Sequence, residues 1–128
     1  MPRARVFLLA MFCAGAVTAV GAWRSMNAVD PRGQDVQVVE VSAERFSFTP
    51  SEVRTKVGAR VEFKIRSDDT DHGFRILGTD INVRIPKRGQ GVVTVPFEPA
   101  KAGRYTFECS KLCGAGHSFM RGTIVVSQ

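Results

Sequence analysis

Histidine, cysteine and tryptophan are scarce in this sequence. Its 128 residues contain two His, three Cys and one Trp, and the odd number of cysteines leaves at least one thiol without an intrachain disulfide partner. We find no sustained helical periodicity, no internal repeat and no low-complexity segment. Apolar residues make up 44% and charged residues 23%, an ordinary globular composition. This composition excludes a collagenous, coiled-coil or fully disordered chain.

The charge balance is basic, with 18 Lys and Arg against 12 Asp and Glu and a net charge of +6. A balance of this size suits nucleic acid, acidic lipid or an acidic protein. The basic residues are scattered, however, and the densest spots are Lys87-Arg88 and the alternating pair Lys64 and Arg66. No basic run and no nucleic-acid motif is present, so we expect no nucleic-acid partner.

Residues 1–24 form a separate N-terminal segment. Residues 6–23 are uncharged, follow a basic N-terminus and would span roughly 27 Å as a helix. This stretch predicts either an uncleaved membrane anchor, which we favour, or a signal peptide cleaved near 19–22. Under either prediction the remainder of the chain is exported. It is then either anchored on the extracytoplasmic side or released into the periplasm. Cys13 lies within the stretch, and we interpret it as a passive apolar residue.

Residues 25–35 are polar, contain Pro and Gly, and indicate a linker. Residues 36–128 then show short runs rich in β-branched and aromatic residues, separated by turn residues. We expect strands at 36–41, 46–48, 53–57, 61–65, 74–77, 81–85, 92–97, 105–107 and 124–126. The sequence therefore predicts one all-β domain, an antiparallel sandwich or small barrel.

The His, Cys and Met residues beyond the linker converge on one segment. Cys109, Cys113, His117 and Met120 follow the pattern C-x3-C-x3-H-x2-M, and His72 precedes them by 37 residues. Glycines within the segment allow it to curl into a loop that aims the four side chains at one point. Thiolates, imidazoles and a thioether suit copper and zinc and do not suit magnesium or calcium.

Four interpretations of these residues remain open. Zinc would use both cysteines and both histidines and leave Met120 unused. A mononuclear blue-copper site would leave Cys109 spare. A Cys109–Cys113 disulfide would leave the His and Met residues unexplained. A dinuclear copper site, with two bridging thiolates and one His on each copper, uses every residue, and we favour it.

The segment from Cys109 to Met120, CSKLCGAGHSFM, resembles the dinuclear copper (CuA) signature of cytochrome c oxidase subunit II and of nitrous oxide reductase. Residues 71–74, DHGF, resemble the segment that carries the first His ligand. The similarity is greatest to the single-helix branch of B-type oxidases. It implies a cupredoxin-like Greek-key β-sandwich in which Cys109 and Cys113 bridge the coppers. His72 and His117 would be terminal ligands, and Met120 and the backbone carbonyl of Lys111 weak ones.

The resemblance also implies one-electron transfer, with this chain as subunit II of a haem–copper oxidase or as a free-standing carrier. Oxygen chemistry would need a separate haem-bearing subunit I, so we expect no catalysis by this chain alone. The domain 36–128 has a net charge of +4, which favours a redox partner, cytochrome c or another donor, with an acidic surface. Trp23 in the leader is the single Trp, so electrons must enter without the Trp of long subunits, and we consider Phe74, Phe119 or a ligand His. A copper chaperone and a mononuclear blue-copper protein remain the alternative functions.

Overall fold

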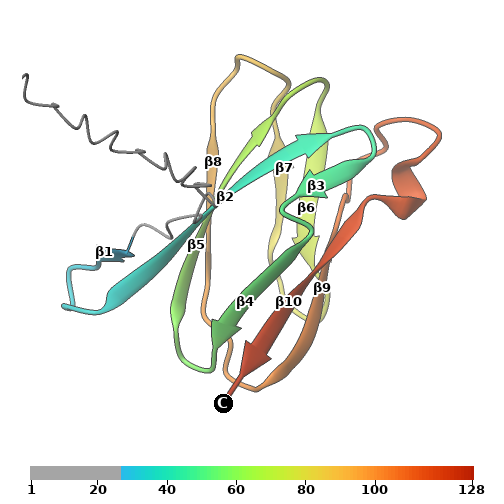
Figure 1. Ribbon diagram of the computed structural model, residues 1–128. Coiled ribbons are helices and arrows are strands. Elements are labelled where there is room, and N and C mark those ends of the chain that lie inside the picture. Colours follow the sequence, from blue (N-terminus) through green and yellow to red (C-terminus); the bar gives the residue numbers. More distant parts are fainter. Residues whose placement is uncertain (1–26) are drawn as a thin grey trace, which may run out of the picture.

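The computed structural model describes residues 27–128 (Figure 1). Two five-stranded sheets pack face to face. The strands are β1 Asn27–Val29, β2 Asp35–Glu44, β3 Ser47–Thr49, β4 Glu52–Lys56, β5 Arg60–Ser67, β6 His72–Ile76, β7 Asn82–Ile85, β8 Val93–Phe97, β9 Gly103–Glu108 and β10 Arg121–Ser127, with one 3-10 helix, η1 His117–Phe119. The predicted all-β sandwich is confirmed, and each expected strand overlaps an observed one.

Both sheets are mixed, whereas the sequence predicted antiparallel ones. The first sheet has the order β1-β2-β5-β8, with β3 also paired to β2, and the second has the order β4-β10-β9-β6-β7. The β2–β5 and β4–β10 pairs are parallel. The chain crosses from β3 in the first sheet to β4 in the second and back to β5, so β5 returns beside β2 in the same direction. Alternation of apolar residues specifies the buried face of a strand and carries no information on its direction.

Phenylalanines from both sheets fill the core. Phe48 and Phe63 come from the first sheet, and Phe74 and Phe107 from the second. Their neighbouring ring centroids lie 5.3–5.8 Å apart, and each side chain is at most 2% exposed. Burial of one such side chain contributes about 1.5–3 kcal/mol to the free energy of unfolding. The cluster fixes β6 and β9 against the opposite sheet.

The range 25–35, for which a linker was expected, contains β1, which pairs antiparallel with β2. The buried carboxylate of Asp30 accepts the backbone N–H groups of Arg32 and Gln34 at 2.8 and 2.9 Å and so shapes the turn between these strands. The predicted anchor or signal peptide at 1–24 lies outside the described residues. From residue 27 onward, no helix has the length and apolar character needed to cross a membrane.

Candidate metal centre

The ends of β6 and β9 define the position of the site. The two strands pair antiparallel, with Arg75 opposite Glu108, so the start of β6 lies beside the chain that follows β9. His72 is the first residue of β6, and Cys109 directly follows β9. The loop from Cys109 to Met120, here called the metal loop, projects at the end of the sandwich opposite the C-terminus (Figure 1). One strand pairing therefore brings His72 to the metal loop.

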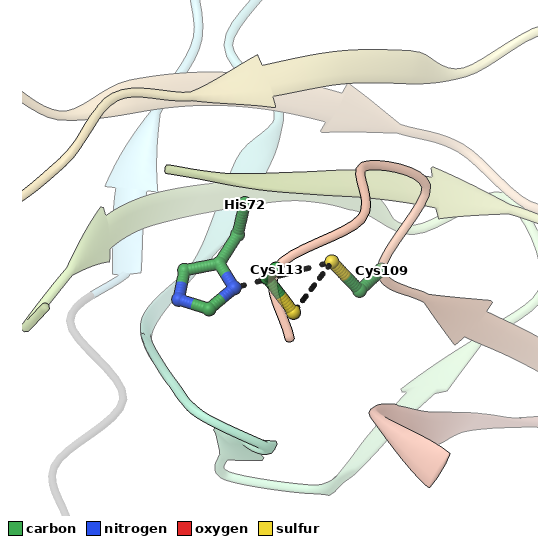
Figure 2. Close-up of side chains that lie close together, drawn as sticks. All are labelled: His72, Cys109 and Cys113. Carbon is green, nitrogen blue, oxygen red and sulfur yellow. Dashed lines mark hydrogen bonds between the residues drawn. The ribbon is translucent and has the colours of Figure 1, made fainter. Parts of the chain in front are cut away.

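Four donor atoms of the site form a connected set around two sulfurs. The sulfurs of Cys109 and Cys113 are 3.8 Å apart, and Nδ1 of His72 is 3.9 Å from the Cys109 sulfur (Figure 2). Nδ1 of His117 is 3.8 Å from the Cys113 sulfur. Each sulfur thus has one imidazole nitrogen at 3.8–3.9 Å.

Two weaker donors complete the set. The thioether sulfur of Met120 lies 3.8 Å from the sulfur of Cys113. The backbone carbonyl oxygen of Lys111 lies 3.1 Å from the sulfur of Cys109, while the residue itself is exposed. The structure therefore gathers all six residues that the sequence singled out, and their role as ligands stays a prediction.

The donor residues on the inner side of the site are buried, and those on its outer side are partly exposed to solvent. His72, Met120 and Cys109 are 0%, 1% and 4% exposed. Cys113 and His117 are only partly buried, in the metal loop near the surface. The inner donors are therefore shielded from water, whereas the His117 side approaches solvent.

Asp69 determines the orientation of the His72 ring. Nε2 of His72 lies 2.7 Å from Oδ1 of Asp69, and the backbone N–H and Nε of Arg45 donate to Oδ2 at 3.0 and 2.9 Å. Burial opposes ionisation of Asp69, but the hydrogen bonds from His72 and Arg45 outweigh it and hold the pKa of Asp69 well below its usual range. The ionised carboxylate can only accept a hydrogen bond, so Nε2 donates to it, and Nδ1, the nitrogen left for a metal, faces Cys109.

Asp71 is nearer to His72 in the chain but does not contact it. The carboxylate of Asp71 instead pairs with Arg84 at 2.6 Å and accepts the backbone N–H of Lys87 at 2.9 Å. Of the two aspartates, only Asp69 contacts His72. Arg45, which supports Asp69 from the turn between β2 and β3, was missed, because nothing in its local sequence indicates a contact 24 residues away.

The metal loop is held by its own backbone and by a contact with β7 of the same sheet. The N–H of Cys109 donates to the carbonyl of Met120 at 2.9 Å, and the N–H of His117 donates to the carbonyl of Gly114 at 3.1 Å. Ser110 Oγ donates to the side-chain oxygen of Asn82 in β7 at 2.7 Å. These bonds between groups of the protein define the path of the loop.

The thiol of Cys113 is protonated at neutral pH. Burial and the neighbouring Cys109 thiol raise the pKa of Cys113 to about 11. A thiolate is a strong metal ligand and a thiol is not, so a metal ion must displace this proton. The pair at 3.8 Å is in the free-thiol state.

The donor set fits copper. Two thiols, two imidazole nitrogens and a thioether are soft or borderline donors, and the carbonyl of Lys111 is the one hard donor beside them. The nearest carboxylate, Asp69, contacts the far nitrogen of His72. Calcium and magnesium require several oxygen donors, and this site offers a single carbonyl. The residues present therefore match the group that the sequence pattern indicated.

Comparison with known proteins agrees with this chemistry. Residues 7–126 match the model of the cupredoxin-like domain family. The chain is 38% identical over 109 residues to a cytochrome c oxidase subunit 2 from Thermus thermophilus, with 84% of this chain and 79% of the relative covered. A second subunit 2, from a named strain of the same organism, has the same identity, and the chain spans 64% of its length.

Solved structures share the fold. A chain of a heme-copper terminal oxidase dimer determined by cryo-EM is 30% identical, with a TM-score of 0.63, 87% of this chain covered and 76% of that chain. The periplasmic domain of subunit II of cytochrome oxidase from Bradyrhizobium japonicum has a TM-score of 0.64 at 17% identity, with 71% of this chain and 83% of that domain covered. At 17% identity, the similarity to the Bradyrhizobium japonicum domain concerns the fold alone.

Proposed function

The chain belongs to the cupredoxin-like domain family and to the family of cytochrome c oxidase subunit 2, and on this premise we propose that its metal centre is a dinuclear copper site that transfers one electron at a time. Copper is its cofactor. The protein accepts electrons from a soluble donor and passes them to a haem-bearing oxidase subunit. The chain itself makes and breaks no substrate bond.

One observation carries the proposal. The two sulfurs lie 3.8 Å apart, and each has a separate imidazole nitrogen at 3.8–3.9 Å. A single tetrahedral ion would use both sulfur–imidazole pairs and leave Met120 unused. Two copper ions would use all of these donors: both sulfurs and the imidazoles of His72 and His117 would hold them. Met120 and the carbonyl of Lys111 would add weaker contacts.

Each residue has a distinct task in this arrangement. Cys109 and Cys113 would hold the copper, which would supply one-electron chemistry. Asp69 holds the His72 ring so that Nδ1 faces inward, and the backbone bonds of the metal loop keep Cys113 and His117 in place. Donors that are already placed move little when the charge of the centre changes, which keeps the reorganisation energy low.

The surface of the metal loop suits a transient protein partner. Leu112 and Phe119 are 76% and 80% exposed, and exposed Lys111 and Arg121 lie beside them in the chain. An apolar centre with a basic rim favours a donor that has an acidic rim around its own redox centre. Phe74, which we considered as a contact for the donor, is 0% exposed and lies in the core. Phe119 and His117 are the better candidates.

We place the domain on the extracytoplasmic side, with residues 1–24 as an anchor or a leader. The basic N-terminus and the uncharged stretch 6–23 support this placement. An oxidase whose haem-bearing subunit lies in the membrane would receive electrons at this surface. A membrane anchor would keep the copper domain beside that subunit.

The structure disfavours the two alternative functions. A mononuclear blue-copper site would leave Cys109 spare, yet its buried sulfur lies between His72 and Cys113. A copper chaperone must hand its ion to another protein, which requires accessible ligands. His72 and Met120 are at most 1% exposed and cannot be reached from outside without opening the fold.

Copper reconstitution of the full chain in detergent tests the proposal. We expect two coppers per chain, a purple colour and an electron paramagnetic resonance spectrum with hyperfine splitting from two equivalent nuclei. One copper with a blue spectrum would indicate a mononuclear site. A colourless Cu(I) that passes readily to an acceptor would indicate a chaperone, and no copper with a Cys109–Cys113 disulfide would reject the metal centre altogether.

A further inference from the structure

The two-residue turn between β2 and β3 contacts the metal centre in two places. This turn consists of Arg45 and Phe46, and it follows from the pairing of Glu44 with Ser47. The parallel pairing of β2 with β5 places Ala43 opposite Ser67, so Arg45, two residues further on, lies beside Asp69. The same turn reaches across to the metal loop through the ring of Phe46.

Arg45 holds the carboxylate that orients His72. Its backbone N–H and its Nε both donate to Oδ2 of Asp69, at 3.0 and 2.9 Å, while Oδ1 faces His72. The two oxygens of one carboxylate are therefore assigned to two different partners. Without the side-chain bond, Oδ2 keeps the backbone N–H of Arg45 alone, while Oδ1 keeps His72 and a longer contact with the Ser67 hydroxyl at 3.4 Å. The carboxylate is then held less firmly, and the His72 ring loses part of its support.

The ring of Phe46 lies against the two glycines that flank Ala115 in the metal loop. A Cβ at Gly114 would lie 2.8 Å from Cε1 of the Phe46 ring, and a Cβ at Gly116 would overlap the ring atoms Cγ and Cδ2. Gly114 follows Cys113, and Gly116 precedes His117. The ring therefore supports the stretch of loop between two of the predicted ligands.

We propose that the Arg45–Phe46 turn is a positioning element of the copper centre, in which Arg45 fixes His72 through Asp69 and Phe46 fixes Cys113 and His117 through the metal loop. The inference deepens the proposed function and rests on it. The turn adds no ligand. It joins the inner and the outer halves of the centre through one two-residue segment of the opposite sheet.

The exposure of the two side chains separates this role from a general stabilising one. The Arg45 side chain is 51% exposed and that of Asp69 is 19% exposed, and ion pairs with so much solvent access add little to the free energy of unfolding. Phe46 is 37% exposed and stands outside the buried core. Loss of either side chain should therefore leave the fold intact and act on the geometry of the centre.

The two histidines of the chain make the test specific. His72 and His117 are its only imidazoles, so histidine-selective isotope labelling gives two sets of ring resonances. We would record them for the full chain in detergent, metal-free and copper-loaded, in wild type, Arg45→Gln and Phe46→Leu. Arg45→Gln should shift the ring resonances of His72 and leave those of His117. Phe46→Leu should do the reverse and speed the loss of copper to a chelator by about tenfold.

Arg45→Lys, which keeps a cation near Asp69, should restore the His72 resonances in part. Two matched controls should leave the ring resonances of both histidines unchanged. Arg54→Gln removes an exposed arginine that pairs with Glu52. Leu77→Ala removes an apolar side chain that is 44% exposed. If both variants of the turn leave both rings unchanged, or move both rings equally, the positioning role is overturned. If the wild type fails to bind two coppers, the proposed function fails, and the metal-free spectra still decide the role of the turn.

Discussion

The backbone N–H of Gly73 donates to the sulfur of Cys109 at 3.4 Å and so joins β6 to the metal loop. This approach requires a residue without a side chain. A Cβ at Gly73 would lie 2.7 Å from the backbone nitrogen of Lys111 and 2.9 Å from that of Ser110, and it would overlap the Ser110 hydroxyl. Backbone atoms cannot turn aside as a flexible side chain can, so the loop itself would have to move.

Gly73→Ala should therefore displace the metal loop. We expect the free energy of unfolding to fall by about 1–3 kcal/mol, the usual cost of an added carbon in a closely packed place. The copper-loaded protein should also lose the hyperfine pattern of two equivalent nuclei. Denaturant titration and paramagnetic resonance measure the two effects. Thr94→Ala, at an exposed position of β8, is the control, and an unchanged spectrum in Gly73→Ala would contradict the requirement for close approach.

A matched pair of substitutions distinguishes the roles of Asp69 and Asp71, the two aspartates near His72 in the chain. Asp69→Ala removes the acceptor of Nε2 and leaves a polar atom unpaired on a ring that is 0% exposed. We expect copper affinity to fall about 10–100-fold. Asp71→Ala breaks an exposed pair with Arg84 and should leave affinity within about twofold. Competition with a chelator of known affinity gives both numbers, and equal losses would show that the orienting role is misassigned.

Either cysteine of the metal loop should be indispensable for the second copper. Cys109→Ser and Cys113→Ser each replace one sulfur of the 3.8 Å pair by a hard oxygen. We expect at most one copper per chain and loss of the purple spectrum in both variants. Cys13→Ser is the control, because this residue is interpreted as passive, and it should retain two coppers. A blue spectrum that survives Cys109→Ser would favour the mononuclear alternative.

Copper binding should strengthen as the pH rises. The pKa of the Cys113 thiol is raised to about 11, so the thiol is protonated at neutral pH and must lose its proton to bind a metal. Each pH unit below that value then costs about a factor of ten in apparent affinity from this proton alone. Between about pH 6 and pH 8 the affinity should rise about a hundredfold or more, with protons released into weakly buffered solution. A flat profile would mean that the thiol ionises before the metal arrives.

The sequence sufficed for the parts of this fold that depend on local pattern. Val61, Phe63 and Ile65 alternate with charged residues, and all three are 0% exposed in β5. The spacing of Cys, His and Met in one short segment likewise identified residues that the structure brings together. In both cases neighbouring residues in the chain carry the information.

Features that depend on tertiary pairing could not be predicted from the sequence. The contact of Arg45 with Asp69 exists because β2 and β5 run parallel, a direction that alternation of apolar residues does not encode. Phe46 was grouped with Phe48 as one strand face, but Phe46 lies in the turn and packs on the metal loop instead. β1 has three residues, too few to show a periodicity.

The exposed apolar side chains of the metal loop should control encounter with the electron donor. Phe119 is 80% exposed and lies between His117 and Met120 in the chain, so it can contact a partner without contributing to the core. Phe119→Ser should lower the second-order rate of electron transfer from an acidic donor about tenfold, since central apolar contacts dominate such interfaces. The absorption spectrum of the copper centre should not change. Val92→Ser alters an apolar residue 60% exposed just before β8 in the other sheet and should leave the rate unaffected. Rising salt should slow an acidic donor by screening its attraction to the basic domain, and a rate that increases with salt would contradict the predicted acidic partner.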